Sequence, residues 1–327
     1  MTFLFHFRSI PHSLNCMKKL TFISLITIMI FHILRLQFIC IEPDLDSIED
    51  RNLRKMIMLG KNLEDERTCR KEIPKCIIVG VIKGGTEAFS TFLALHPQVA
   101  MQFKAKPTLY FTDINYKKGK SWYKNQMPCS KHGQITIEKS PQYWGWNHAP
   151  SRIHLFYPTM KVILVVRDPV SRATSHYLKQ IYSNPDELQG KTFEEMITDG
   201  NGEINTKSRV LQLSAYAPIL KQWLRHFKQN QILIVDGNNL NKNPVMELRR
   251  AERFLNLTSY INRDMFVKNT ERDLYCIKSK CGKEYCLPES KSSGHPDIDE
   301  KVLEKLKKYF DPLNEEFFKI TGRKFVW

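Results

Sequence analysis

The sequence is short of acidic residues and lacks both low-complexity tracts and internal repeats. In 327 residues, 34 acids stand against 50 lysines and arginines, giving a formal net charge of +16. Such a surplus attracts polyanions, namely nucleic acid, acidic membranes or an anionic polysaccharide, or it only keeps the surface soluble. With 42% apolar residues, the chain can bury a sizeable core. Its length fits one large domain plus a short accessory segment.

The cysteines lack the spacing of a metal site. Cys276, Cys281 and Cys286 follow one another at equal intervals, but no CxxC pair or histidine partner accompanies them. We therefore expect no metal, and we predict a disulfide between Cys276 and Cys286 that closes a small hairpin in an oxidising compartment. A glycosylation sequon that begins at Asn256 fits the same compartment.

Charged residues are absent from residues 20–34. Lys18 and Lys19 precede this stretch and five acids follow it between residues 42 and 50. Tolerating two polar residues extends the stretch to residue 41, about the length that a bilayer needs. The charge asymmetry places the N-terminus in the cytosol. We predict a cytoplasmic tail (1–19), a transmembrane signal anchor (20–41), a stem (42–72) and a lumenal domain (73–327), with secretion after signal cleavage as the alternative.

Short β-branched runs alternate with helical patterns from residue 73 onward. Strands are expected at 76–82, 161–166 and 231–235. Helices are expected at 88–95, 175–180, 211–227, 245–255 and 301–320. This alternation indicates an α/β fold, a P-loop-like, mostly parallel sheet flanked by helices.

The segment Lys83-Gly84-Gly85-Thr86 joins the first strand to its helix. Glycines let the backbone approach an anion, and a helix start offers unpaired N–H groups. The lysine that a Walker loop places after its last glycine is missing, which disfavours a nucleotide kinase. Arg167 ends the second strand and Ser175 lies in the next helix, so both can reach a ligand above the sheet. An ordinary glycine turn, and an Arg167–Asp168 pair, are the alternatives.

Further motifs follow this loop in a fixed order. They are His96-Pro97, Gly133-Gln134-Ile135-Thr136-Ile137-Glu138-Lys139-Ser140-Pro141, Val165-Val166-Arg167-Asp168-Pro169, Ser175-His176-Tyr177, Trp223-Leu224-Arg225-His226-Phe227, Val235-Asp236-Gly237, Tyr275-Cys276, His295-Pro296 and Gly322-Arg323-Lys324-Phe325. The ordered set resembles the heparan sulfate glucosamine 3-O-sulfotransferases, and more distantly the sulfotransferase domain of the N-deacetylase/N-sulfotransferases. The resemblance runs from about residue 73 to the C-terminus.

The resemblance implies a Golgi membrane enzyme that transfers a sulfonyl group from 3′-phosphoadenosine 5′-phosphosulfate (PAPS) to a glucosamine hydroxyl of a heparan sulfate-like polysaccharide. The implied site residues are Lys83, Gly84, Gly85, Thr86 and Glu87 at the 5′-phosphosulfate; Arg167 and Ser175 at the 3′-phosphate; Tyr275, Lys291, Ser292, Ser293, Gly294 and His295 over the nucleotide; and Lys139, Lys106 and Lys179 at the acceptor sugar. Lys83 would also balance the charge that develops on the bridging oxygen as the sulfonyl group leaves. Nucleic acid is not an expected partner.

The sequence departs from the family pattern at the expected catalytic base. Lys106 takes the place of the glutamate that deprotonates the sugar hydroxyl, Thr108 that of a histidine and Phe111 that of an aspartate. General-base assistance is worth roughly 10² to 10⁴ in rate. Glu87 stands where the family usually has arginine, either as a replacement base or as an acid that complements the helix dipole. The alternative to an active enzyme is an impaired protein that binds PAPS, its product PAP or a polyanion.

Overall fold

The computed structural model describes residues 69–103, 107–183, 190–279, 282–287 and 298–327. The predicted tail and anchor, nearly all of the predicted stem, Lys106 and residues 291–295 lie outside these ranges. Within the described ranges, no helix combines the length and apolarity needed to cross a bilayer.

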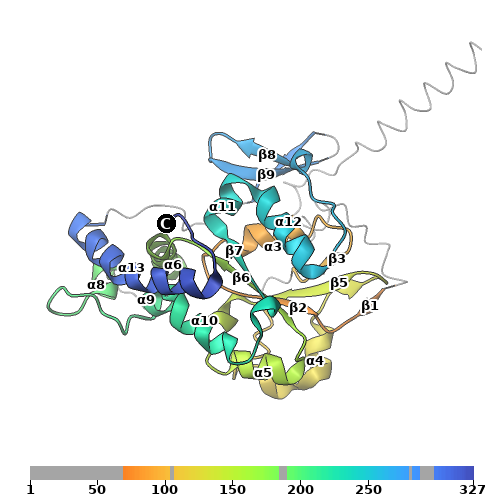
Figure 1. The fold of residues 1–327 in the computed structure, drawn as a ribbon, viewed down its shortest axis with the longest axis horizontal. Coiled ribbons are helices and arrows are strands. Elements are labelled where there is room, and N and C mark those ends of the chain that lie inside the picture. Colours follow the sequence, from red (N-terminus) through yellow and green to blue (C-terminus); the bar gives the residue numbers. More distant parts are fainter. Residues whose placement is uncertain (1–68, 104–106, 184–189, 280–281, 288–297) are drawn as a thin grey trace, which may run out of the picture.

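A five-stranded parallel sheet forms the centre of the fold (Figure 1). In spatial order its strands are β3 (Val99–Met101), β5 (Ile135–Lys139), β2 (Cys76–Gly80), β6 (Lys161–Val166) and β7 (Ile232–Asp236). β2 is buried along its whole length, as a continuous apolar run predicts. The strands expected near residues 76, 161 and 231 are thus confirmed, while β3 and β5 were not expected.

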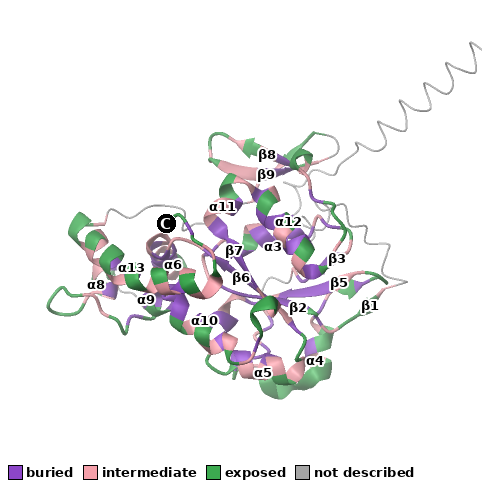
Figure 2. Ribbon diagram, viewed as in Figure 1, coloured by how far each residue is buried: buried purple, intermediate pink, exposed green. Residues whose placement is uncertain are grey.

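Helices cover both faces of the sheet (Figures 1 and 2). Successive β2 side chains alternate between two cores: Ile77 and Val79 enter one, Cys76 and Ile78 the other. The first core is closed by α4 (Gly119–Asn125), α5 (Ala149–Phe156) and α10 (Tyr216–Leu224). The second is closed by α3 (Thr86–Leu93), α11 (Gly237–Lys242) and α12 (Pro244–Leu255).

A third apolar cluster joins α6 (Pro169–Ser183), α8 (Phe193–Ile197), α9 (Arg209–Ser214) and α13 (Glu300–Thr321). The single helix expected over 211–227 is wrong, because Ala215 is non-helical and separates α9 from α10. The sequence carries the cause: the ring of Pro218 would clash with the Ser214 carbonyl, four residues earlier, in a continuous helix.

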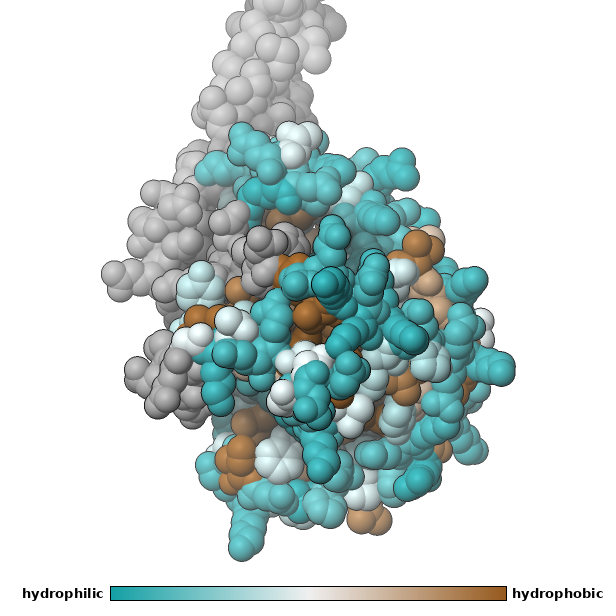
Figure 3. Space-filling model, turned by 90° about the vertical axis from the view of Figure 1, so that its left-hand side faces the viewer, coloured by the Kyte–Doolittle hydropathy of each residue, from teal (hydrophilic) through white to brown (hydrophobic). Residues whose placement is uncertain are grey.

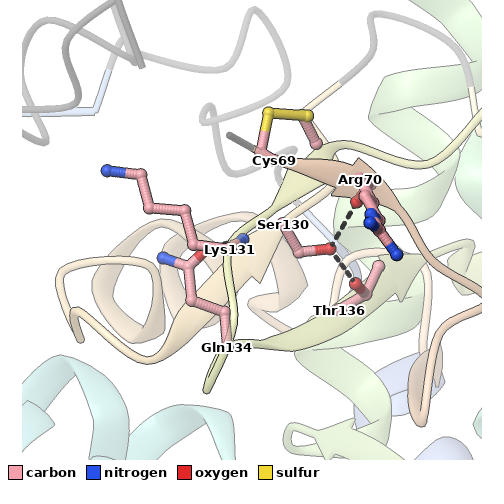
Figure 4. The surroundings of a disulfide bond; sticks show 7 residues. Cys69, Arg70, Ser130, Lys131, Gln134 and Thr136 are labelled. Carbon is pink, nitrogen blue, oxygen red and sulfur yellow. Dashed lines mark hydrogen bonds between the residues drawn. A yellow bond between two sulfur atoms is a disulfide. The ribbon is translucent and has the colours of Figure 1, made fainter. Parts of the chain in front are cut away.

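Each of two small antiparallel sheets is closed by a disulfide. Cys276–Cys286 confirms the predicted pair and links β9 (Leu274–Lys278) to β10 (Glu284–Tyr285), beside β8 (Phe266–Asn269). A second disulfide, not expected from the sequence, joins Cys69 to Cys129, where β1 (Arg70–Lys71) pairs with β4 (Cys129–Ser130). Beside it, the Ser130 hydroxyl donates to the Arg70 carbonyl and lies 2.7 Å from the Thr136 hydroxyl (Figure 4). Residues 69–71 therefore pack on the sheet domain.

Candidate active site

The glycine loop after β2 lies directly on the end of β6. The Val81 N–H donates to the Val165 carbonyl at 2.9 Å, and the Gly84 N–H donates to the Val81 carbonyl at 3.0 Å. A Cβ on Gly84 would sit 2.3 Å from the Val165 oxygen. A Cβ on Gly237, the first residue of α11, would sit 2.1 Å from the Gly84 oxygen. Three chain segments thus meet at distances that only glycine permits.

The loop leads directly into the start of α3. Gly85 precedes the helix with φ 100°, a left-handed conformation, and its lack of a side chain leaves the helix start without a side-chain cap. Lys83 also has a positive φ of 67°, which is uncommon for a residue with a Cβ. The turn therefore presents a lysine next to the positive end of a helix dipole, an arrangement suited to an anion.

Three cations from three elements gather above the sheet. Lys83 comes from the loop, Arg167 from the end of β6 and Lys179 from α6. Burial lowers the pKa of Lys83, and the neighbouring charges of Lys179 and then Arg167 lower it further. Positive groups that repel one another around a half-buried lysine favour binding of a multiply charged anion among them, at the end of a parallel sheet where a ligand crevice is expected.

Arg167 has no protein partner for its Nε–H within the part of the chain that the structure describes, although this atom is buried. The expected alternative, a pair with Asp168, does not form among these residues: Asp168 Oδ1 accepts from the Ser171 N–H at 2.6 Å at the start of α6. The backbone at Arg167 is fixed instead, since the Tyr216 hydroxyl donates to its carbonyl at 2.7 Å. A buried donor without an acceptor is costly, so the crevice fits a phosphate oxygen at this position.

Ser175 and Lys179 lie one turn apart on α6, and Ser175 is half-buried. The charge of Lys179 acts on Lys83, whereas Ser175 stays a predicted contact of the 3′-phosphate. Thr86 is buried in the first turn of α3.

Lys139 and Glu87 meet beside the glycine loop. Lys139 ends β5, and its ammonium forms an ion pair and hydrogen bond with the Glu87 carboxylate in the first turn of α3. The Lys139 side chain is mostly buried, whereas that of Glu87 is 52% exposed. The residue expected to bind the acceptor sugar is therefore in contact with the acid that is either a replacement base or a complement to the helix dipole.

Glu138, next to Lys139, anchors a buried polar network that sequence reasoning missed. Its Oε2 accepts from the Tyr123 hydroxyl at 2.5 Å, and its Oε1 accepts from Ser140 at 2.7 Å, Tyr143 at 2.9 Å and Thr108. Burial raises the pKa of the Glu138 carboxyl, and these hydrogen bonds oppose the shift. Because Glu138 is fully buried, its carboxylate holds residues 107–111 against β5 and does not face a substrate.

A buried arginine, also missed, connects the loop to α6 and α9. The guanidinium of Arg172 donates to the Ile82 carbonyl at 3.3 Å, to the Ser214 hydroxyl at 2.6 Å and to the Val210 carbonyl at 2.5 Å, and lies 3.2 Å from Nδ1 of His176. Burial lowers the pKa of Arg172 to about 10. It therefore fixes the carbonyl that immediately precedes Lys83.

The remaining predicted residues are placed as follows. Tyr275 is half-buried in β9, which packs against α11. Asn256 is exposed at the end of α12. Lys106, Lys291, Ser292, Ser293, Gly294 and His295 lie outside the described residues. Among those that are described, no group of three or more histidine, cysteine, aspartate or glutamate side chains could hold a metal ion.

Comparison with known proteins decides the family. The sulfotransferase domain family matches residues 74–325. Heparan sulfate glucosamine 3-O-sulfotransferase 5 of Homo sapiens is 40% identical over 263 residues, which cover 79% of this chain and 75% of that protein. The chain belongs to the heparan sulfate glucosamine 3-O-sulfotransferases. The mouse 3A1 enzyme of this family is also 40% identical, over 261 residues, 79% of this chain and 65% of that protein.

The sulfotransferase fold is confirmed in space. A sulfotransferase from Alicyclobacillus acidocaldarius superposes with a TM-score of 0.57, covering 78% of this chain and 98% of that one at 18% identity. The family membership confirms the resemblance drawn from the ordered motifs and gives no support to an impaired nucleotide-binding protein. Relative to the family pattern, Thr108 now has an observed role, because it bonds to Glu138 and Tyr143.

Proposed function

We propose that this sulfotransferase transfers a sulfonyl group from PAPS to a glucosamine hydroxyl of a heparan sulfate-like polysaccharide. The single observation that carries the proposal is the cluster of Lys83, Arg167 and Lys179 at a glycine loop, with the Arg167 Nε–H buried and lacking a partner within the described ranges. The names of the relatives support the acceptor class.

Different residues of the chain would bind the two ends of the donor. Lys83, Gly84, Gly85 and Thr86 would hold the 5′-phosphosulfate, and Arg167 with Ser175 the 3′-phosphate. PAPS supplies an activated sulfonyl group when bound. The Lys83 ammonium, carried by the loop, would stabilise the negative charge that develops on the donor as the sulfonyl group leaves. Tyr275 and residues 291–295 remain proposed contacts of the nucleotide.

For the base, we infer that Glu87 accepts the proton of the acceptor hydroxyl, because the expected position holds Lys106. Its ion pair with Lys139 supports this assignment, since Lys139 is the residue proposed to face the acceptor sugar. Glu87→Gln keeps the shape and removes the basicity, so kcat should fall by roughly 10² or more while PAP affinity changes little. Glu194→Gln, in the first turn of α8, is the matched control. A kcat for Glu87→Gln within about threefold of wild type would exclude the assignment.

The function itself is tested by incubating the purified full-length protein with ³⁵S-labelled PAPS and heparan sulfate. Incorporation of label that Lys83→Ala abolishes supports the proposal. Tight PAP binding by wild type without incorporation into heparan sulfate contradicts it. Equal incorporation into wild type and Lys83→Ala reactions would mean that the crevice is not the donor site.

We further propose that the domain works in the Golgi lumen, held by the predicted anchor at 20–41. Two disulfides suit an oxidising compartment, and both Asn256 and Thr258 of the sequon are exposed. Glycosidase treatment should increase the electrophoretic mobility of the protein from secretory cells, and Asn256→Gln should show the treated mobility without treatment. Mobility unchanged by the glycosidase would argue against glycosylation at this residue.

A further inference from the structure

The junction between α9 and α10, residues 214–216, is a buried break in a helical segment. Ser214 ends α9, Tyr216 begins α10, and Ala215 between them has φ −78° and ψ 83°, outside the helical region. All three residues are buried. Buried polar groups need hydrogen-bond partners, and the two hydroxyls of the junction find theirs on the segment that leads from β6 into α6.

These two hydroxyls hold the backbone on both sides of the β6–α6 turn. The Tyr216 hydroxyl donates to the Arg167 carbonyl at 2.7 Å, and the Ser214 hydroxyl donates to the Pro169 carbonyl at 3.0 Å. The Arg167 Nε–H, by contrast, is buried and has no partner within the described residues. The backbone of Arg167 is therefore fixed by the junction, while its side chain keeps a buried donor for a ligand.

The junction is also connected to the glycine loop, through Arg172. The Ser214 hydroxyl accepts from Arg172 Nε at 2.6 Å, and a terminal nitrogen of the same guanidinium donates to the Ile82 carbonyl at 3.3 Å. Ile82 immediately precedes Lys83. One buried junction is thus bonded to the backbone of Arg167 directly and to the backbone beside Lys83 through one side chain. These are the two residues that would hold opposite ends of the donor.

The Tyr216 ring is held in place by the C-terminal part of the chain. The rings of Phe317, in α13, and Trp327 have their centroids 5.5 and 5.6 Å from that of Tyr216. The face that carries α8 and α13 is largely hydrophilic (Figure 3), so the enclosed ring lies beneath a solvated surface. Burial raises the pKa of the Tyr216 phenol above its ordinary value. The hydroxyl therefore keeps its proton and remains a donor to the Arg167 carbonyl.

We propose that the α9–α10 junction, through the Tyr216 hydroxyl, aims Arg167 at the 3′-phosphate and so sets the preference of the site for a nucleotide that carries this group. Tyr216 is a positioning residue, because it is buried and bonds to the Arg167 backbone. The inference rests on the proposed function for the identity of the donor. Hydrogen bonds from a guanidinium to a phosphate depend on geometry, so a small shift of the Arg167 backbone weakens them. A nucleotide without a 3′-phosphate gains nothing from this alignment.

The test compares the affinity of the full-length protein for PAP and for adenosine 5′-phosphate (AMP), which lacks only the 3′-phosphate, by calorimetric titration. Tyr216→Phe keeps the ring and removes the hydroxyl, so PAP affinity should fall roughly tenfold while AMP affinity changes less than about twofold. Tyr177→Phe is the matched control, because its hydroxyl also donates to a backbone carbonyl, that of Lys191, at 2.9 Å; it should leave the ratio of the two affinities unchanged. Equal weakening of PAP and AMP in Tyr216→Phe, an unchanged ratio, or a wild type that binds PAP no more tightly than AMP would overturn the inference.

A double-mutant cycle shows whether Tyr216 acts through Arg167. Arg167→Ala removes the guanidinium, so adding Tyr216→Phe to it should change PAP affinity less than about twofold. A further tenfold loss in the double variant would mean that Tyr216 acts elsewhere, and the proposal would fall. Ser214→Ala, which releases the Pro169 carbonyl and Arg172 Nε, should lower the preference for PAP in the same direction and replaces Tyr216→Phe if that variant does not fold.

Measuring nucleotide binding apart from sulfate transfer separates this inference from the proposed function. If wild type transfers no sulfate to heparan sulfate, yet Tyr216→Phe lowers the preference for PAP over AMP about tenfold, the role of the junction stands and the activity falls. If wild type transfers sulfate while Tyr216→Phe and Tyr177→Phe both keep the wild-type preference, the activity stands and the role of the junction falls.

Discussion

Replacing Glu138 with alanine tests whether the buried carboxylate network fixes the acceptor side of the site. In this variant the hydroxyls of Thr108 and Tyr143, 2.9 Å apart, can still hydrogen-bond to each other. The hydroxyls of Tyr123 and Ser140 lose the acceptor that they have in the described structure. Each orphaned buried hydroxyl costs about 1–3 kcal/mol, so the free energy of unfolding should fall by about 4 kcal/mol. For a domain of this size that lowers Tm by roughly 8–16 °C.

Differential scanning calorimetry measures this loss, with Glu304→Ala on the exposed face of α13 as a control expected within about 0.5 kcal/mol of wild type. Glu138→Gln should lower the free energy of unfolding less than Glu138→Ala, because the amide oxygen still accepts hydrogen bonds from the hydroxyls. Burial raises the folded-state pKa of Glu138, so its contribution is present at low pH and is lost as pH rises through that pKa. The stability difference between wild type and Glu138→Gln should therefore shrink with rising pH. An alanine variant as stable as wild type would refute the structural role.

Three other predictions concern the donor site and the disulfides. Arg172→Met should weaken PAP binding about tenfold or more by releasing the Ile82 carbonyl, with Arg172→Lys between it and wild type in a calorimetric titration; unchanged PAP affinity in Arg172→Met would contradict a positioning role. PAP affinity should fall as pH rises, because only the protonated form of Lys83 attracts the anion. Since the pKa of Lys83 is lowered, this fall should begin at a lower pH than the pKa of an ordinary lysine. An identical pH profile in Lys83→Arg would count against this. Removing Cys69–Cys129, which spans 60 residues, should lower the free energy of unfolding by about 4 kcal/mol. Removing Cys276–Cys286, which spans 10 residues, should lower it by about 3 kcal/mol. The reverse order of Tm in the two double-serine variants would disprove the loop-length argument.

The central strands could be predicted because burial on both faces leaves a continuous apolar run in the sequence. β2 and β6 show such runs, whereas β5 carries Thr136, Glu138 and Lys139 among its five residues. A glutamate in a central strand is tolerated only because Tyr123, Tyr143 and other hydroxyls reach it from distant segments. Such compensation is tertiary, so local periodicity did not reveal β5.

The candidate site likewise has residues that the sequence reveals and residues that it does not. Lys83 and Arg167 could be identified because strand ends and glycine turns have a fixed place in a parallel sheet. Arg172 lies inside a helix, four residues before His176, and nothing local distinguishes it from an exposed arginine. Likewise, Cys276–Cys286 closes a hairpin that short spacing suggests, whereas Cys69 and Cys129 meet only because β1 returns to β4.

Two departures from the family pattern have opposite charge. Where the resemblance leads us to expect arginine after the glycine loop, the chain has Glu87, and where it leads us to expect a glutamate base, the chain has Lys106. The net charge at these two positions is thus unchanged. Glu87 contacts Lys139 at the end of β5, so on the proposed role of Lys139 a carboxylate remains near the acceptor although it comes from α3. A base needs reach and basicity and does not need a particular position in the sequence. The exchange is therefore compatible with turnover, and the double variant Glu87→Arg/Lys106→Glu should recover activity that Glu87→Arg alone loses.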